Sequence, residues 1–184
     1  MTKQRKSPRL KDYDYAQNGA YFVTILTHKR QSLFGHINRD SEMLLSQFGK
    51  IAQKCWQSIP EHFTNIELDQ FTIMPNHLHG IVLLSEPPPV TDVRERHASP
   101  LHNQQHYLDD YKVKSGSLIA MVGSYKSVVT RQINLIRETK SPPIWHRSFH
   151  DHIIRNDVEL NKLREYTLYN PSLWARDRYY NEAD

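Results

Sequence analysis

The chain has 184 residues, of which 38% are hydrophobic and 10% aromatic, and its formal net charge is +4. These proportions exclude a disordered polypeptide and predict one packed domain spanning 1–184, either as a monomer or as a homodimer. Cys55 is the only cysteine, which excludes a disulfide framework, and no apolar run is long enough to cross a bilayer, so we expect a cytoplasmic protein without membrane contact.

Basic residues gather in an N-terminal extension, 1–15, and recur through the second half of the chain. Lysine and arginine side chains neutralise phosphate groups, so these residues are candidates for binding DNA. The alternative interpretation of the extension is a solvated basic tail. The candidate contacts are Lys3, Arg5, Lys6, Arg9, Lys126, Arg131, Arg147 and Arg155.

The first predicted elements are a strand and a helix. Residues 20–28 are rich in aromatic and β-branched side chains, which favour a strand. Within 41–58, apolar residues recur at spacings of three and four, the period of a helix with one buried face. Pro60 is expected to end this helix because proline cannot donate the next backbone hydrogen bond.

Two further strands, 66–74 and 77–84, flank Pro75-Asn76 and predict an antiparallel hairpin. The second of these strands begins with His77 and His79. Side chains two apart on a strand point to the same face, so both imidazoles can bind one divalent cation. The alternative is that two histidines merely flank a leucine on a half-buried strand.

The middle of the chain combines an insertion with a long helix. Residues 86–115 contain three consecutive prolines and few apolar side chains, which predicts a flexible insertion. A longer amphipathic helix is predicted over 117–138. Tyr125 lies on its apolar stripe, so we assign Tyr125 to the core rather than to chemistry.

The last predicted elements are a strand over 148–155 and a short helix that begins at Asn156 and is stopped by Pro171. Tyr166 and Asn170 are four residues apart on this helix. Side chains at that spacing lie one above the other, so the phenol and the amide would project together. If the helix packs over the strand carrying the histidines, the result is a metal site of two imidazoles and one amide beside a tyrosine hydroxyl.

The order of these elements is strand, helix, strand, strand, helix, strand, helix. It predicts an α+β protein with the ferredoxin-like plan, in which an antiparallel sheet carries helices on one face. The helix bearing Tyr166 is a C-terminal addition to that plan.

The motif His77-Leu78-His79 resembles the histidine-hydrophobic-histidine motif of the HUH endonucleases. Together with 144–155 and 166–171, it makes the chain from Tyr21 to Pro171 similar to the REP-associated tyrosine transposases, which are HUH single-tyrosine transposases related to those of insertion sequences. The resemblance implies that His77 and His79 are metal ligands. It also implies that Tyr166 is the catalytic nucleophile and that Asn170 is a third ligand.

The activity implied by the resemblance is that of a metal-dependent endonuclease and strand transferase for single-stranded DNA. It would use Mg²⁺ or Mn²⁺, pass through a 5′-phosphotyrosine intermediate and act on repetitive extragenic palindromic hairpins. Two other functions are compatible with the residues alone. One is a metal-dependent phosphoesterase that activates water, and the other is a catalytically silent protein that binds DNA hairpins.

Overall fold

The computed structural model describes residues 14–86 and 114–180. The four basic candidates Lys3, Arg5, Lys6 and Arg9 lie outside the described residues, as do nearly all of the predicted extension, 1–15, and of the predicted insertion, 86–115. Within the described ranges, no helix is long and apolar enough to cross a membrane.

The centre of the fold is a four-stranded sheet with the order β4-β5-β1-β6. Each pair of neighbouring strands is antiparallel, and β1 lies between two strands that come much later in the chain. This order is the ferredoxin-like plan, so the predicted fold class is confirmed. The strands are β1 (Gly19–Leu26), β4 (Ile66–Met74), β5 (His77–Leu84) and β6 (His150–Ile154).

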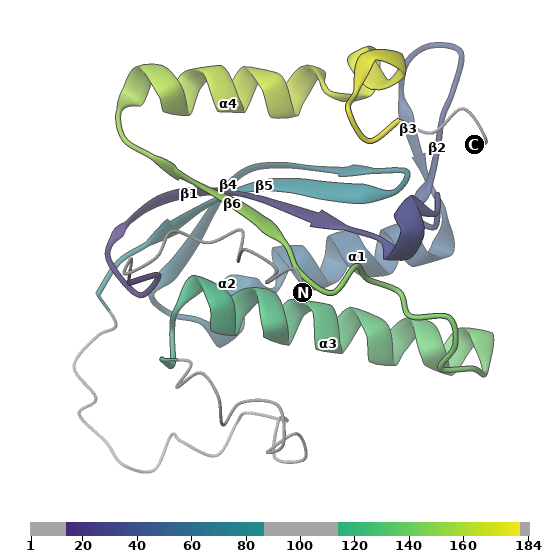
Figure 1. Ribbon diagram of the computed structural model, residues 1–184, viewed down its shortest axis with the longest axis horizontal. Coiled ribbons are helices and arrows are strands. Elements are labelled where there is room, and N and C mark those ends of the chain that lie inside the picture. Colours follow the sequence, from purple (N-terminus) through teal and green to yellow (C-terminus); the bar gives the residue numbers. More distant parts are fainter. Residues whose placement is uncertain (1–13, 87–113, 181–184) are drawn as a thin grey trace, which may run out of the picture.

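Helices cover both faces of this sheet (Figure 1). The helices α1 (Gln47–Gln57), α2 (Ile59–His62) and α3 (Leu118–Arg137) lie on one face, as the ferredoxin-like plan predicts. The C-terminal helix α4 (Asp157–Tyr169) lies on the opposite face and is followed by the short helix η4 (Pro171–Arg176). The sheet therefore separates the main core from the helix that carries Tyr166.

The segment between β1 and α1 differs from the prediction. It contains the short helix η1 (His28–Arg30) and a small hairpin of β2 (Gly35–Ile37) and β3 (Met43–Leu45), so the helix predicted over 41–58 begins later, at Gln47. The hydroxyl of Ser46 sets that start by accepting a hydrogen bond from the Gly49 backbone N–H at 3.1 Å. Pro60 does not end α1 but lies in the first turn of α2, where a missing N–H leaves no hydrogen bond unmade.

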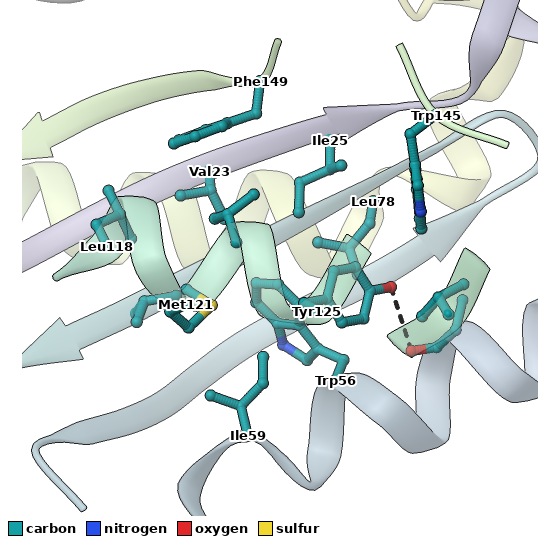
Figure 2. Close-up of a cluster of buried hydrophobic side chains, with 14 of the residues drawn as sticks. Val23, Ile25, Trp56, Ile59, Leu78, Leu118, Met121, Tyr125, Trp145 and Phe149 are labelled. Atoms are coloured by element: carbon teal, nitrogen blue, oxygen red, sulfur yellow. Dashed lines mark hydrogen bonds between the residues drawn. The ribbon is translucent and has the colours of Figure 1, made fainter. Parts of the chain in front are cut away.

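The core between the sheet and the helices α1 and α3 is dominated by large apolar side chains (Figure 2). Trp56 is fully buried at its centre, and an added Cβ at Gly80 would lie 2.4 Å from the Trp56 ring, so only glycine lets β5 approach this closely. Tyr125 is buried here, and its hydroxyl donates a hydrogen bond to the Ala52 carbonyl at 3.2 Å. The assignment of Tyr125 to the core is confirmed.

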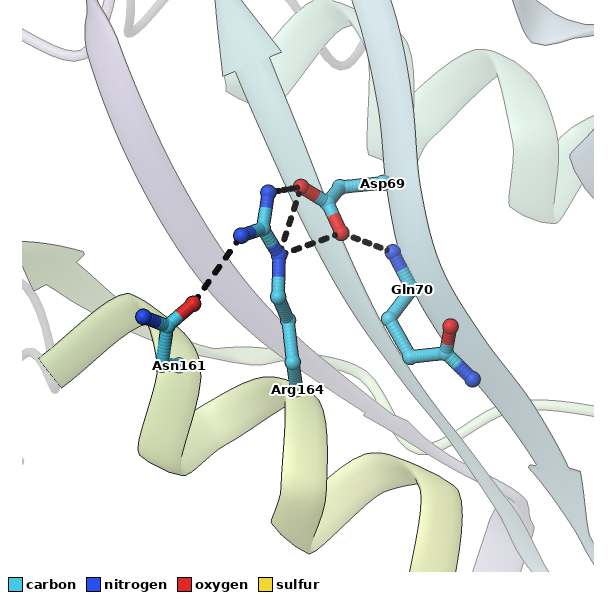
Figure 3. Close-up of polar contacts among 4 residues, drawn as sticks. All are labelled: Asp69, Gln70, Asn161 and Arg164. Carbon is cyan, nitrogen blue, oxygen red and sulfur yellow. Dashed lines mark hydrogen bonds and ion pairs between the residues drawn. The ribbon is translucent and has the colours of Figure 1, made fainter. Parts of the chain in front are cut away.

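An ion pair between α4 and the edge strand β4 holds α4 over the sheet (Figure 3). The register of β4 against β5 shifts between Leu68 and Phe71, and Asp69 lies in that irregularity. The Arg164 guanidinium donates hydrogen bonds from Nε to both oxygens of Asp69, at 3.0 and 3.1 Å. A bulge re-aims a strand side chain, and here it presents a carboxylate to the helix.

Candidate active site

Both histidines of β5 lie on the sheet face covered by α4. They pair across the sheet with β1, His79 opposite Thr24 and His77 opposite Leu26. The intervening Leu78 points to the other face and belongs to the main core. His77 and His79 are buried, with exposed fractions of 0% and 2%, and their ring centroids are 4.4 Å apart.

The protonation of His77 follows from its hydrogen-bond partners. The Asn76 amide nitrogen donates to the Tyr179 carbonyl at 2.8 Å, so the amide oxygen must be the atom that faces Nδ1 of His77, also at 2.8 Å. A neutral Asn76 oxygen only accepts, so Nδ1 of His77 carries the proton. The lone pair is then on Nε2, a buried atom without a hydrogen-bond partner. An outer partner that fixes the imidazole in this way is the usual arrangement for a metal-binding histidine.

His79 is positioned between a threonine and the tyrosine of α4. Its Nδ1 lies 2.8 Å from the Thr24 hydroxyl, and its Nε2 lies 3.3 Å from the hydroxyl of Tyr166. Phe22 stacks on the His79 ring with centroids 5.0 Å apart. Tyr166 and His79 are 87 residues apart in sequence and meet because α4 packs across β5.

Tyr166 and Asn170 lie side by side at the C-terminal end of α4, as their spacing predicts. Both donate a hydrogen bond to one oxygen, Oδ2 of Asp177, at 3.2 Å from the Tyr166 hydroxyl and 3.1 Å from the Asn170 amide nitrogen. This contact turns the Asn170 amide so that its oxygen, Oδ1, faces a buried region in which it has no partner. The amide oxygen is therefore available to a cation.

Asp177 is the residue of this cluster that the sequence did not predict. Ligand atoms of His77, His79 and Asp177 all lie within 4.8 Å of one another, the only such group of three found in the described parts of the chain. Two imidazole nitrogens, a carboxylate and an amide oxygen form a mixed nitrogen and oxygen donor set that can bind a divalent cation. The two unpaired buried atoms, Nε2 of His77 and Oδ1 of Asn170, show that the residues present fit a divalent metal.

Burial controls the charge of these groups. It lowers the pKa of His77 to about 3, with help from the positive charge of Arg178, and it lowers the pKa of His79 well below its ordinary value. Both imidazoles are therefore neutral at physiological pH, the form that binds metals. Burial, followed by the negative charge of Asp177 and the hydrogen bond to it, raises the pKa of Tyr166 to about 12, so the phenol keeps its proton in the resting protein.

Three of the basic candidates lie together on the opposite face of the sheet. Lys126, Arg131 and Arg147 line one groove of about 1170 Å³ between α3 and the segment that follows it. The same groove contains Lys140 and one acidic residue, Glu138. Lys126 bridges its two sides by donating hydrogen bonds to the carbonyls of His146 and Arg147.

Arg155 does not join this groove. It is exposed at the start of α4, where its backbone N–H donates a hydrogen bond to the carboxylate of Glu159. Arg178 lines a pocket together with Tyr166, and both Arg178 and Arg30 contact the ring of Tyr179, at 4.5 and 5.6 Å from its centroid. Neither position carried a spacing signal in the sequence.

The chain matches no known family profile, but it is similar to curated proteins and to solved structures. An uncharacterized protein of Haemophilus influenzae is 35% identical over 176 residues, which cover 96% of this chain and 93% of that protein. A putative REP-associated tyrosine transposase of the same bacterium is 24% identical over 159 residues, covering 86% and 73% of the two chains. The structure of a REP-associated tyrosine transposase bound to a REP hairpin superposes with a TM-score of 0.54 at 17% identity, covering 94% of this chain and 73% of the other.

Proposed function

Since this chain belongs to one family with the uncharacterized Haemophilus influenzae protein and resembles the REP-associated tyrosine transposases in sequence and fold, we propose that it cleaves and rejoins single-stranded DNA. The substrate is a DNA hairpin with single-stranded flanks, and the intermediate is a 5′-phosphotyrosine. The observation that carries this proposal is the Tyr166 hydroxyl 3.3 Å from Nε2 of His79, beside two buried ligand atoms that lack partners.

The reaction follows from the position of Tyr166. Its oxygen attacks the scissile phosphorus and forms a P–O bond while the bond from phosphorus to the 3′ oxygen breaks. The phenol proton passes along the existing hydrogen bond to Asp177, which then returns it through a water molecule to the departing 3′ oxygen, so that the carboxylate is restored. Attack of a 3′-hydroxyl on the phosphotyrosine reverses these steps and joins the strands. The link thus preserves the phosphodiester energy for strand transfer.

The metal would be held by His77, His79 and Asn170, with Asp177 as an additional oxygen donor in the same cluster. A bound Mg²⁺ or Mn²⁺ would orient the scissile phosphate and neutralise the charge that develops on it. Asn76 and Thr24 keep the two imidazoles in place through Nδ1. The hydrogen bond from the Asn170 amide nitrogen to Asp177 keeps the Asn170 amide oxygen pointed away from the Asp177 carboxylate.

The groove on the opposite face is the proposed contact for the duplex stem. Its four cationic residues are Lys126, Arg131, Lys140 and Arg147, and a single acidic residue opposes them. Cations spaced along a groove bind a phosphate backbone without reading its sequence. Replacing Arg131 and Arg147 by glutamine should weaken binding of every hairpin to a similar extent and reduce the salt dependence of the affinity. A hairpin affinity that is unchanged would remove the groove from this role.

The test of the function is incubation of the full chain with end-labelled hairpin DNA and Mn²⁺, followed by denaturing gel electrophoresis. We expect a labelled DNA strand that migrates with the protein and is released by protease treatment. Tyr166→Phe should form no adduct, whereas Tyr169→Phe, a change of the same size at the exposed neighbour, should form it normally.

The other outcomes select the alternative functions. Cleavage without any adduct would show that water is the nucleophile and that the protein is a phosphoesterase. Hairpin binding with neither cleavage nor metal dependence would show a silent DNA-binding protein. Either result would overturn the proposed transferase.

A further inference from the structure

A second pocket opens directly beside the candidate active site. It has a volume of about 430 Å³ and lies between β1, β6, α4 and the segment after η4. Tyr166 and His79 form one wall, so whatever enters the pocket lies against the nucleophile and a metal ligand. The volume falls near the lower end of the range for small-ligand sites, roughly 300–1,000 Å³, which fits one nucleotide rather than a base pair within a duplex.

The sheet register explains why the pocket is lined by rings. Thr24 of β1 pairs with His79 on one side and His150 on the other, while Phe22 pairs with His152. Directly opposed residues of antiparallel strands share a face, so all of these side chains point toward α4. Two imidazoles of β6 and one phenyl ring of β1 therefore form the floor.

The remaining wall supplies the positive charge. Arg178 lies over the ring of Tyr179, 4.5 Å from its centroid, and both residues line the pocket. A guanidinium held against an aromatic ring offers a flat surface for a base and donors for a phosphate. At the rim, Nε2 of His152 donates to the Glu159 carboxylate at 2.7 Å, which leaves Nδ1 of His152 for another partner.

We propose that this pocket holds one unpaired nucleobase, that of a nucleotide adjoining the scissile phosphate. The inference rests on the proposed function and identifies the part of the DNA that the site reads. Rings stack on a base of any sequence, whereas the imidazole nitrogens of His150 and His152 reach its polar edge. The single-stranded flank of the substrate, rather than its stem, is therefore selected here.

The experiment is a thermodynamic cycle that compares the DNA affinities of protein variants for intact hairpins and for hairpins with an abasic site. The protein carries Tyr166→Phe so that the DNA stays intact, and the probe is a hairpin whose single-stranded flanks contain an abasic site at successive positions. We expect one position at which loss of the base weakens binding in Mn²⁺ about tenfold. In the His150→Ala/His152→Ala variant, the same abasic site should cause no further loss.

The matched control is His62→Ala, an exposed histidine of α2 on the other face of the sheet, which should retain the full tenfold abasic effect. His152→Ala alone should give a partial effect, and melting curves of all variants establish that they are folded. Equal abasic effects in the pocket variant and the control, or no sensitive position at all, would overturn the inference.

Adduct formation by the protein that retains Tyr166, measured in parallel, separates this result from the proposed function. If the protein forms the adduct but the abasic site and the histidine substitutions weaken binding independently, the proposed transferase function is supported and the base pocket is rejected. If the abasic site causes no further loss in the histidine variant but no adduct forms, the protein has a site for an unpaired base and does not cleave DNA.

Discussion

The two faces of the sheet are built from alternate residues of the same strands, and they differ in how their polar groups are used. On the face covered by α1 and α3, Val23, Ile25 and Leu78 pack into the apolar core, and the Tyr125 hydroxyl has a carbonyl partner. On the face covered by α4, the neighbouring positions Thr24 and His79 are polar although they are equally buried.

This difference shows where the fold gives up stability. A buried polar atom without a partner costs about 1–3 kcal/mol. On the α4 face, Nε2 of His77 and Oδ1 of Asn170 are such atoms, and they lie at the same site. The other such atoms in the described residues are Oγ of Ser32, Nε1 of Trp56 and Oδ1 of Asp151, and of these Nε1 of Trp56 lies in the main core. Two unpaired acceptors at one place are what a cation site requires, whereas a lone indole N–H is a donor and binds no cation.

The largest expected contrast is between Tyr166 of the candidate site and the buried Tyr125 of the core. Tyr166→Phe should lower adduct formation by a factor on the order of 10³ or more, because it removes the attacking oxygen. Tyr125→Phe should leave the adduct unchanged and lower the free energy of unfolding by about 1 kcal/mol, because the bond to Ala52 is lost. Denaturing gels and urea unfolding measure the two quantities. Adduct formation by the Tyr166 variant would assign the reaction to another residue.

The next contrast uses adjacent residues of β5. His77→Ala should weaken Mn²⁺ binding by about 100-fold, measured by calorimetry, because a ligand nitrogen is removed. Leu78→Ala should lower the free energy of unfolding by about 3 kcal/mol through the cavity it leaves in the core. The folded Leu78 variant should bind Mn²⁺ as the wild type does. Wild-type affinity in the His77 variant would show that the imidazole has only a structural role.

Asn170→Ala tests the amide of α4. If the amide oxygen binds the metal, adduct formation should fall about tenfold at low Mn²⁺ and recover in part at high Mn²⁺. The exposed Asn161→Ala, on the same helix, should have neither effect. A loss of about 1 kcal/mol in stability, with activity that does not respond to Mn²⁺, would instead assign Asn170 to the end of the helix.

The smallest expected effect concerns the ion pair that holds α4 on the sheet. Arg164→Gln should lower the free energy of unfolding by about 1 kcal/mol, since the pair is partly exposed. Adduct formation should fall severalfold because Tyr166 lies on the same helix. Asp69→Asn should act similarly, and the double variant should be little worse than either single change. Additive losses would mean that the two residues act independently.

Local patterns predicted the fold well where periodicity is long. The hairpin strands predicted at 66–74 and 77–84 have those bounds, and the helix predicted over 117–138 is Leu118–Arg137. The hairpin of β2 and β3 was missed because each strand has three residues, too few to show an alternation. Ser46, rather than the apolar spacing, determines where α1 begins.

The candidate site was predictable only in part. Spacing alone indicated that His77 and His79 share a face and that Tyr166 adjoins Asn170. Spacing could not show that the two pairs lie together, because that depends on how α4 packs on β5. The resemblance to the transposases provided that expectation. Asp177 carried no signal because it follows Pro171 in an irregular segment, where no periodicity relates it to Tyr166.

The sheet order also has a consequence for protein synthesis. β1 leaves the ribosome first, yet its partners on either side are β5 and β6. At roughly 5–20 residues per second, β6 is made on the order of ten seconds after β1. During that interval β1 exposes an unpaired edge, which invites association with other chains. Under the proposed function, a nascent chain has its metal-binding histidines well before its nucleophile, so it becomes able to cut DNA only after the segment through Asp177 has emerged.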